Sequence, residues 1–350
     1  MWEVRVTPCG EFDNAPFESR HFETRPLTSA MGAEVVGVRL PELSDEGLED
    51  FKQALYHHKM LYAKGQNLSH AEHEAFAARL GPFAVDAYTQ GVPGHREVHP
   101  IIKEADQKAA SLFGGGWHTD SPFLAEPPAV TFLRCVECPP YGGDTSWANC
   151  ALALRHLSPT YQDMIRPLKV WMSAVNNFAT QEKLMGKAIQ FADQEQYEQG
   201  IRGTVHPLVK RHPETGEESL NICDTYAAGI DGMTTHEAKP LLDFLVQHAT
   251  QHAFTCRLRW EPGMVAMWDN RCTMHLGPND YDGYRREMYR TTTARTSSTE
   301  NRAAASSAKK LSSSSTLLGS GVKICRRLIA QTRFSWYSAP IASSRPLTSS

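Results

Sequence analysis

The sequence predicts a mainly β domain with flanking helices, followed by a C-terminal tail. Short runs rich in β-branched and aromatic residues, bounded by turn-forming residues, recur from residue 117 onward. The first hundred residues instead contain two segments with the apolar spacing and N-capping residues of amphipathic helices. After about residue 297 the sequence becomes rich in serine, alanine and basic residues, which is typical of a disordered segment. We therefore expect a domain over residues 1–297 and a disordered tail over 298–350.

The N-terminal part predicts two strands and two helices. Residues 31–38 are expected to form a strand, and residues 60–63 a buried one. Between them, Ser44 is a suitable N-cap for a helix with acidic residues in its first turn. Ser69 and Glu72 have the spacing of a capping box and predict a second helix directly after it.

Residues 84–113 are expected to be rich in loops, and loops at such positions often contribute to substrate specificity. Beyond them, strands are predicted over residues 129–136, around 145, and over 218–223, 254–260, 264–268 and 285–293. Helical inserts are predicted near 151–166 and 190–201. A third helix follows the capping pair Thr234 and Glu237, and we expect His248 on its surface.

The last predicted strand places two arginines on one face. Because side chains alternate in a strand, Arg286 and Arg290 point to one side, and Arg285 and Glu287 to the other. Two arginines are costly to bury without an anion. Both faces carry charge, so the pattern alone does not decide which one is buried.

Composition limits the class of protein. With 350 residues, 41% of them hydrophobic and 21% charged, the chain can bury a substantial core, and no run approaches the ~18 apolar residues of a membrane helix. The first 300 residues carry 28 basic against 39 acidic side chains, which argues against nucleic acid as the main partner. Eight cysteines without regular spacing, and no secretory signal at the N-terminus, favour a reducing cytoplasmic location. The oligomeric state stays open, with a homo-oligomer as one alternative.

Three residues form a candidate metal site. If the segment around residue 118 is extended, His118 and Asp120 point to the same side and can converge on one point. A second histidine, His275, ends the apolar run that starts near residue 264. Two histidines and one carboxylate are the ligand set of non-haem Fe(II), which leaves three coordination positions open.

Four short motifs in order resemble the taurine/2,4-dichlorophenoxyacetate dioxygenase family (TauD/TfdA), whose members depend on Fe(II) and 2-oxoglutarate. They are Trp-His-Thr-Asp at 117–120, Gly-Gly-Asp-Thr at 142–145, Trp-Asp-Asn-Arg-x-Thr-x-His at 268–275 and Arg-Arg-x-Met-x-Arg at 285–290. The resemblance extends from about residue 25 to 296. It implies a double-stranded β-helix, the jelly roll of cupin-like proteins, with helical inserts.

The resemblance also implies roles for these residues. His118, Asp120 and His275 would hold Fe(II) and so carry the catalysis. Arg286 would bind the distal carboxylate of 2-oxoglutarate in a bidentate manner, with Thr145 donating a hydrogen bond to it. The enzyme would release succinate and CO₂ and hydroxylate its substrate with O₂. Because the carboxylate ligand is present, the halogenase variant of the family is disfavoured.

The substrate implied is a small organic anion: a sulfonate, a sulfate ester or a carboxylate. Arg290 matches the arginine that holds the sulfonate in the taurine branch. Two pocket positions depart from that branch, since Gly114 replaces an asparagine and Asp86 a histidine, so taurine itself is disfavoured. Tyr88 and Tyr226 are expected to line a wider, more aromatic pocket. Two alternatives stay open: a taurine dioxygenase proper, and a non-catalytic jelly-roll protein that binds a metal or a small anion.

Overall fold

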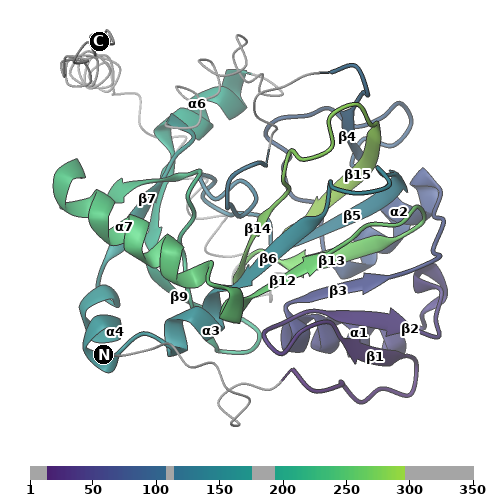
Figure 1. The fold of residues 1–350 in the computed structure, drawn as a ribbon, viewed down its shortest axis with the longest axis horizontal. Coiled ribbons are helices and arrows are strands. Elements are labelled where there is room, and N and C mark those ends of the chain that lie inside the picture. Colours follow the sequence, from purple (N-terminus) through teal and green to yellow (C-terminus); the bar gives the residue numbers. More distant parts are fainter. Residues whose placement is uncertain (1–13, 108–113, 176–193, 296–350) are drawn as a thin grey trace, which may run out of the picture. The chain divides into compact units, whose positions relative to one another are not determined.

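The computed structural model describes residues 14–107, 114–175 and 194–295 (Figure 1). The predicted tail, 298–350, and the first residues of the insert predicted near 190–201 lie outside these ranges. Within the described part, no helix has both the length and the apolar character needed to cross a membrane.

The main sheet has seven strands in the order β1-β2-β3-β13-β5-β15-β4. Neighbouring strands are antiparallel except β2 and β3, which are parallel. Their bounds are Glu23–Pro26 (β1), Ala33–Val36 (β2), Met60–Ala63 (β3), Val265–Asp269 (β13), Val130–Glu137 (β5), Arg286–Thr293 (β15) and His99–Lys103 (β4).

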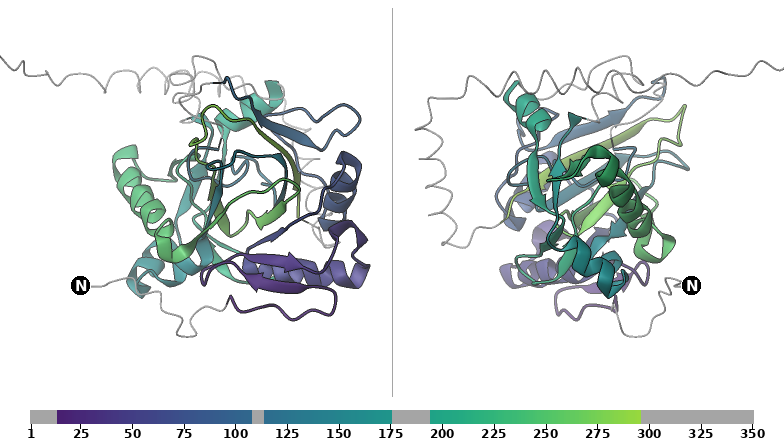
Figure 2. Two further views of the ribbon diagram at one scale, coloured as in Figure 1. Left: turned by 45° about the vertical axis from the view of Figure 1, so that its right-hand side comes forward. Right: turned by 90° about the vertical axis from the view of Figure 1, so that its left-hand side faces the viewer.

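A second sheet, β12-β6-β14, faces the main one. It consists of Thr255–Leu258 (β12), Thr145–Asn149 (β6) and Thr273–Leu276 (β14). The ring of Trp147 on β6 packs edge-on against that of Trp268 on β13, with 5.5 Å between centroids, and so links the two sheets. The strands of both sheets curve around a common interior (Figure 2). Residues that point inward from either sheet can therefore meet there.

Two helices cover the outer face of the main sheet. They are α1 (Asp45–His58) and α2 (His70–Leu80), and a short 3-10 turn, η1 (Leu40–Glu42), precedes α1. The Ser44 side chain accepts a hydrogen bond from Gly47 N, and the capping box at Ser69 forms as predicted. Phe51 and Phe76 on these helices pack edge-on at 5.8 Å and belong to a core cluster distinct from the one between the sheets.

An insert of short elements covers the open side of the second sheet. Its strands form a three-stranded sheet, β11-β7-β8, and a two-stranded sheet, β10-β9. The bounds are Cys150–Arg155 (α3), Pro159–Ile165 (α4), Lys169–Met172 (β7), Gln194–Arg202 (α6), Thr204–Pro207 (β8), Val209–Arg211 (β9), Glu218–Leu220 (β10), Ala227–Ile230 (β11), Thr235–Ala249 (α7) and His252–Phe254 (η2).

The structure refines two expectations about local structure and overturns a third, the surface position of His248. Residues 84–113 contain a strand, β4, which pairs with β15 across the register His99 to Arg290. The helical insert predicted near 151–166 is present as two short helices, because Pro159 starts the second one after the Ser158 cap. His248 is buried rather than on the surface, since α7 packs against α3 and its Nε2 lies 2.8 Å from the Ala153 carbonyl oxygen. Its pairing with a carbonyl makes it a core histidine.

Candidate active site

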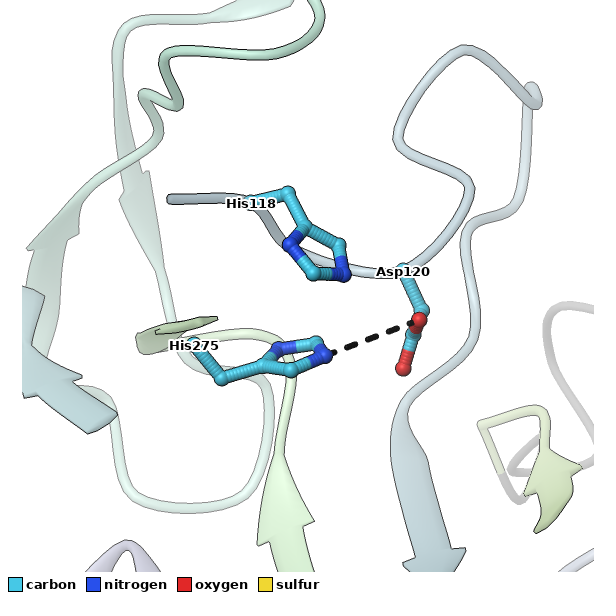
Figure 3. A group of neighbouring side chains, drawn as sticks. All are labelled: His118, Asp120 and His275. Atoms are coloured by element: carbon cyan, nitrogen blue, oxygen red, sulfur yellow. Dashed lines mark ion pairs between the residues drawn. The ribbon is translucent and has the colours of Figure 1, made fainter. Parts of the chain in front are cut away.

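The three candidate metal ligands lie together in the interior between the sheets (Figure 3). His275 projects from β14, while His118 and Asp120 belong to the segment that leads toward β5. One ligand atom from each residue can be chosen so that all lie within 4.8 Å of one another, and His275 Nε2 is 3.9 Å from Asp120 Oδ1. All three side chains are buried.

A backbone bridge fixes the two histidines relative to each other. His118 N donates to the His275 carbonyl oxygen at 2.9 Å, and His275 N donates to the His118 carbonyl oxygen at 2.7 Å. The segment at His118 is thus extended only at this bridge and not part of a longer strand. The bridge suffices to direct His118 and Asp120 to the same side, as the spacing predicted.

The protonation states of the three residues suit a divalent cation. Burial lowers the pKa of His118, and burial together with the neighbouring His118 ring lowers the pKa of His275 well below its usual value. Burial would raise the pKa of Asp120, but His275 and Arg290 outweigh it and lower that pKa. His118 Nδ1 lies 2.8 Å from the Gly116 carbonyl oxygen, so that Nε2 is left to face the centre. Two neutral imidazoles and a carboxylate therefore converge, a donor set that fits Fe(II).

Two residues that we did not predict hold Asp120 in place. The Thr131 hydroxyl donates to Asp120 Oδ2 at 2.5 Å, and Asn270 Nδ2 donates to the Thr131 oxygen at 2.7 Å. Asn270 Oδ1 in turn accepts from Trp268 Nε1 at 3.1 Å. Asn270 lies inside a motif that we singled out, but Thr131 looks like any β-branched strand residue. Its role depends on a contact that only the fold creates.

Arg286 is a buried cation whose hydrogen-bond partner is a backbone carbonyl. Its Nε donates to the Gly143 carbonyl oxygen at 3.0 Å, and burial lowers the pKa of its guanidinium. Among the residues that the structure describes, no carboxylate forms an ion pair with it. Nearby, Thr145 accepts a hydrogen bond from Trp260 Nε1 at 2.9 Å, which directs the Thr145 hydroxyl hydrogen to another acceptor. Both groups are thus prepared to donate to an anion.

Arg290, the second arginine that is costly to bury without an anion, has carboxylate partners within the chain. Its Nη2 hydrogen-bonds to Asp86 Oδ2, and its Nη1 lies 3.2 Å from Asp120 Oδ1. Burial would lower the pKa of Arg290, but Asp86 and Asp120 raise it above its usual value. The cost of burying Arg290 therefore does not by itself require an external anion, because the chain supplies carboxylates.

The remaining predicted pocket residues fall into two groups. The hydroxyls of Tyr88 and Tyr226 are 3.0 Å apart, and both rings pack on Phe123, so the two predicted tyrosines do come together. Gly114 has φ +85°, and a Cβ there would lie 3.2 Å from His118 Cε1. A larger residue at 114 would thus require the His118 ring to move. The presence of glycine at this position therefore has a steric explanation that does not depend on the substrate.

Comparison with known proteins places this site in a family. Residues 23–292 match the taurine catabolism dioxygenase TauD, TfdA family. An α-ketoglutarate-dependent sulfate ester dioxygenase from Pseudomonas putida is 32% identical over 274 residues, covering 78% of this chain and 89% of that protein. An (S)-phenoxypropionate/α-ketoglutarate dioxygenase from Sphingobium herbicidovorans is 31% identical over 261 residues, covering 73% and 88%.

Solved structures of related proteins support the same family assignment. A taurine dioxygenase from Burkholderia xenovorans superposes with a TM-score of 0.66 at 34% identity, covering 78% of this chain and 89% of that one. The predicted fold class, mainly β with a jelly-roll core and flanking helices, is thereby confirmed, and the non-catalytic alternative is not supported. The chain belongs to the TauD/TfdA family and is an Fe(II)- and 2-oxoglutarate-dependent dioxygenase.

Proposed function

We propose that this dioxygenase hydroxylates a small organic anion, with His118, Asp120 and His275 as the iron ligands. The observation that carries the assignment is the cluster itself, in which two neutral imidazoles and one carboxylate are buried and converge within one coordination sphere. Bound Fe(II) would supply O₂ activation coupled to the decarboxylation of 2-oxoglutarate. The protein supplies the fixed positions and excludes bulk water.

Arg286 and Thr145 would bind the distal carboxylate of 2-oxoglutarate. The support is electrostatic: Arg286 is buried, its pKa is lowered by that burial, and the described residues include no carboxylate paired with it. A dicarboxylate that reaches it would satisfy the guanidinium in a bidentate manner. The hydroxyl hydrogen of Thr145, directed by Trp260, would add one more donor to the same carboxylate.

Arg290 would receive the anionic group of the substrate, near Tyr88 and Tyr226. The relatives named above act on a sulfate ester and a phenoxypropionate, both organic anions. The guanidinium of Arg290 also contacts Asp120, which places it beside the metal ligands. A substrate held there would have its carbon chain close to the metal.

We also propose a cytoplasmic location for the enzyme. All six cysteines in the described part of the chain are free thiols, as expected in a reducing compartment.

The test is substrate-stimulated release of succinate with uptake of O₂. We expect turnover in the wild type with at least one member of a screen of alkyl sulfates, sulfonates, aryloxy acids and amino acids. His118→Ala should abolish turnover while leaving the melting temperature within a few degrees of that of the wild-type apoprotein. Full turnover in His118→Ala would refute the assignment of the metal ligands.

A matched control separates the metal site from the general effect of losing a histidine. His248→Ala removes another buried histidine, one that contacts the Ala153 carbonyl oxygen and does not belong to the metal cluster. It should lower stability without affecting Fe(II) binding. An equal loss of Fe(II) binding in both variants would show that His118 acts only through the fold.

A further inference from the structure

Asp86, the carboxylate paired with Arg290, lines a large cavity. The cavity has a volume of about 850 Å³ and is lined by most residues of the segment 83–99 and by Gln196 of α6. Its polar lining includes Asp86, Thr89, Glu97 and His99. Asp86 thus connects the cavity wall to Arg290, which also contacts the candidate metal ligand Asp120.

Asp86 is held rigidly in this position. Its Oδ1 accepts hydrogen bonds from Tyr88 N and Thr89 N at 2.9 Å each, and from the Thr89 hydroxyl at 3.2 Å. His99 Nδ1, on the strand opposite Arg290, lies 4.0 Å from Oδ2. Although burial would raise its pKa, Arg290 and His99 lower it, so the carboxylate is ionised. It is a fixed negative charge rather than a mobile side chain that an entering anion could displace.

The charges near Arg290 already balance within the chain. Arg290 faces two carboxylates, and if Asp120 is used as a metal ligand, one cation and one anion remain. A substrate anion that approaches the guanidinium then meets the Asp86 charge at nearly the same distance. Attraction and repulsion largely cancel for such an anion, so a simple anion gains little from this arginine.

We infer that Asp86 determines specificity at the substrate site. The site accepts organic anions that also carry a hydrogen-bond donor next to the anionic group, and it discriminates against anions that lack one. This inference rests on the proposed role of Arg290. Because Asp86 Oδ2 is hydrogen-bonded directly to the guanidinium, only a donor close to the bound anion can reach it. An α-ammonium beside a carboxylate, as in an amino acid, has that geometry.

Two probes that differ only in the donor test this inference: hexanoate and 2-aminohexanoate. Their binding to the full-length protein is measured by calorimetry with Fe(II) and 2-oxoglutarate under anaerobic conditions. The wild type should prefer 2-aminohexanoate, roughly tenfold or more. Asp86→Asn should bind hexanoate at least tenfold more tightly than the wild type and lose that preference. The asparagine oxygen can still accept from Tyr88 N and Thr89 N, so the local turn is preserved.

Glu97→Gln is the matched control, because it removes a carboxylate from the same cavity at a residue that has no ion pair with Arg290. It should change hexanoate affinity far less than Asp86→Asn does. Unchanged or weaker hexanoate binding in Asp86→Asn, or no detectable binding in either protein, would overturn the inference, provided that 2-oxoglutarate binding shows the variant to be folded.

Arg290→Met separates this inference from the proposed function. Arg290→Met is introduced into the wild-type and the Asp86→Asn protein. If it lowers the affinity for neither hexanoate nor 2-aminohexanoate, the anion does not bind at Arg290 and the proposed substrate site itself is wrong. If Arg290→Met weakens binding but Asp86→Asn does not strengthen it, only the role of Asp86 is wrong.

Discussion

Arg286 and Arg290 occupy the same face of β15, four residues apart, and yet they are in opposite electrostatic states. Arg286 has a backbone carbonyl as its partner and a pKa lowered by burial. Arg290 contacts two carboxylates, and its pKa is raised. The same residue type on the same strand can thus serve as an incomplete binding site or as a completed ion pair. The pairing state of each arginine is decided by the segment of the chain that packs against its position on β15.

The difference teaches how a buried charge indicates function. A buried cation that lacks a protein anion is costly and is retained where a ligand completes it. A buried cation with its own carboxylates is a weaker indication of an anionic ligand, because the fold already satisfies it. Arg286 therefore supports 2-oxoglutarate binding more strongly than Arg290 supports binding of an anionic substrate.

The largest expected effect is on stability at the paired arginine. Arg290→Met leaves Asp86 and Asp120 buried without their cation, and breaking such a pair costs about 3–5 kcal/mol. Urea denaturation of the metal-free protein measures it. Addition of Fe(II) should restore part of the loss, because Asp120 then has a cation again. A loss below about 1 kcal/mol would mean that the pair contributes little to stability.

Arg286→Met should give the contrasting result. Affinity for 2-oxoglutarate should fall about 100-fold or more, since the bidentate donor is lost, while stability stays within about 1 kcal/mol of wild type. Calorimetry and urea denaturation measure the two effects. Arg285→Met is the control on the opposite face, where the side chain forms ion pairs with Glu104 and Glu137. It should leave 2-oxoglutarate affinity unchanged. Equal losses in both variants would remove the special role of Arg286.

The residues behind Asp120 should have a smaller effect. Thr131→Val removes the hydroxyl that donates to Asp120 and keeps the shape of the side chain. Loss of such a support typically lowers metal affinity about 10–100-fold, and we expect the lower end, because Arg290 also contacts Asp120. Competition with a metal chelator measures it. Thr292→Val, at the position opposite Thr131 on β15, is the control and should retain wild-type affinity.

The smallest effect concerns pH. In the wild type, Arg290 and His99 help to lower the pKa of Asp86, so the stability contributed by this carboxylate is present above its unfolded pKa of about 3.9. In Arg290→Met, burial without the cation should raise the pKa values of Asp86 and Asp120. The variant then takes up protons as the pH falls, and its stability deficit should be smaller at pH 5 than at pH 8, by about 1 kcal/mol. A deficit independent of pH would show that these carboxylates do not titrate in this range.

Local signals in the sequence predicted much of the fold, and the three candidate metal ligands that they indicated do come together. Ser44, Ser69 and Thr234 each cap the helix that they were expected to start, because capping depends only on residues within one turn. The motifs around His118, Thr145, His275 and Arg286 mark residues that the fold brings into one interior. Strand alternation predicts the common direction of His118 and Asp120, whereas the roles of Thr145 and Arg286 are what the family resemblance implies.

The failures share a different cause. β4 was missed because its residues acquire a strand partner only from β15, far along the chain. The pairing of Asp86 with Arg290 joins residues 204 positions apart, so no local sequence pattern could predict it. The resemblance marked Asp86 as a pocket position, but the consequence of its charge depends on which cation it faces. Long-range partners, rather than residue types, were the missing information.

The backbone bridge between His118 and His275 has a consequence for how the enzyme matures. Its two hydrogen bonds join residues 157 positions apart, so the contact closes a long loop whose entropic cost must be met by the packing of both sheets. The ligands cannot converge before the domain has folded, and the metal cannot template the early steps of folding. Iron loading is therefore a late event, and the exchange of the His118 and His275 amide hydrogens reports when the centre has closed.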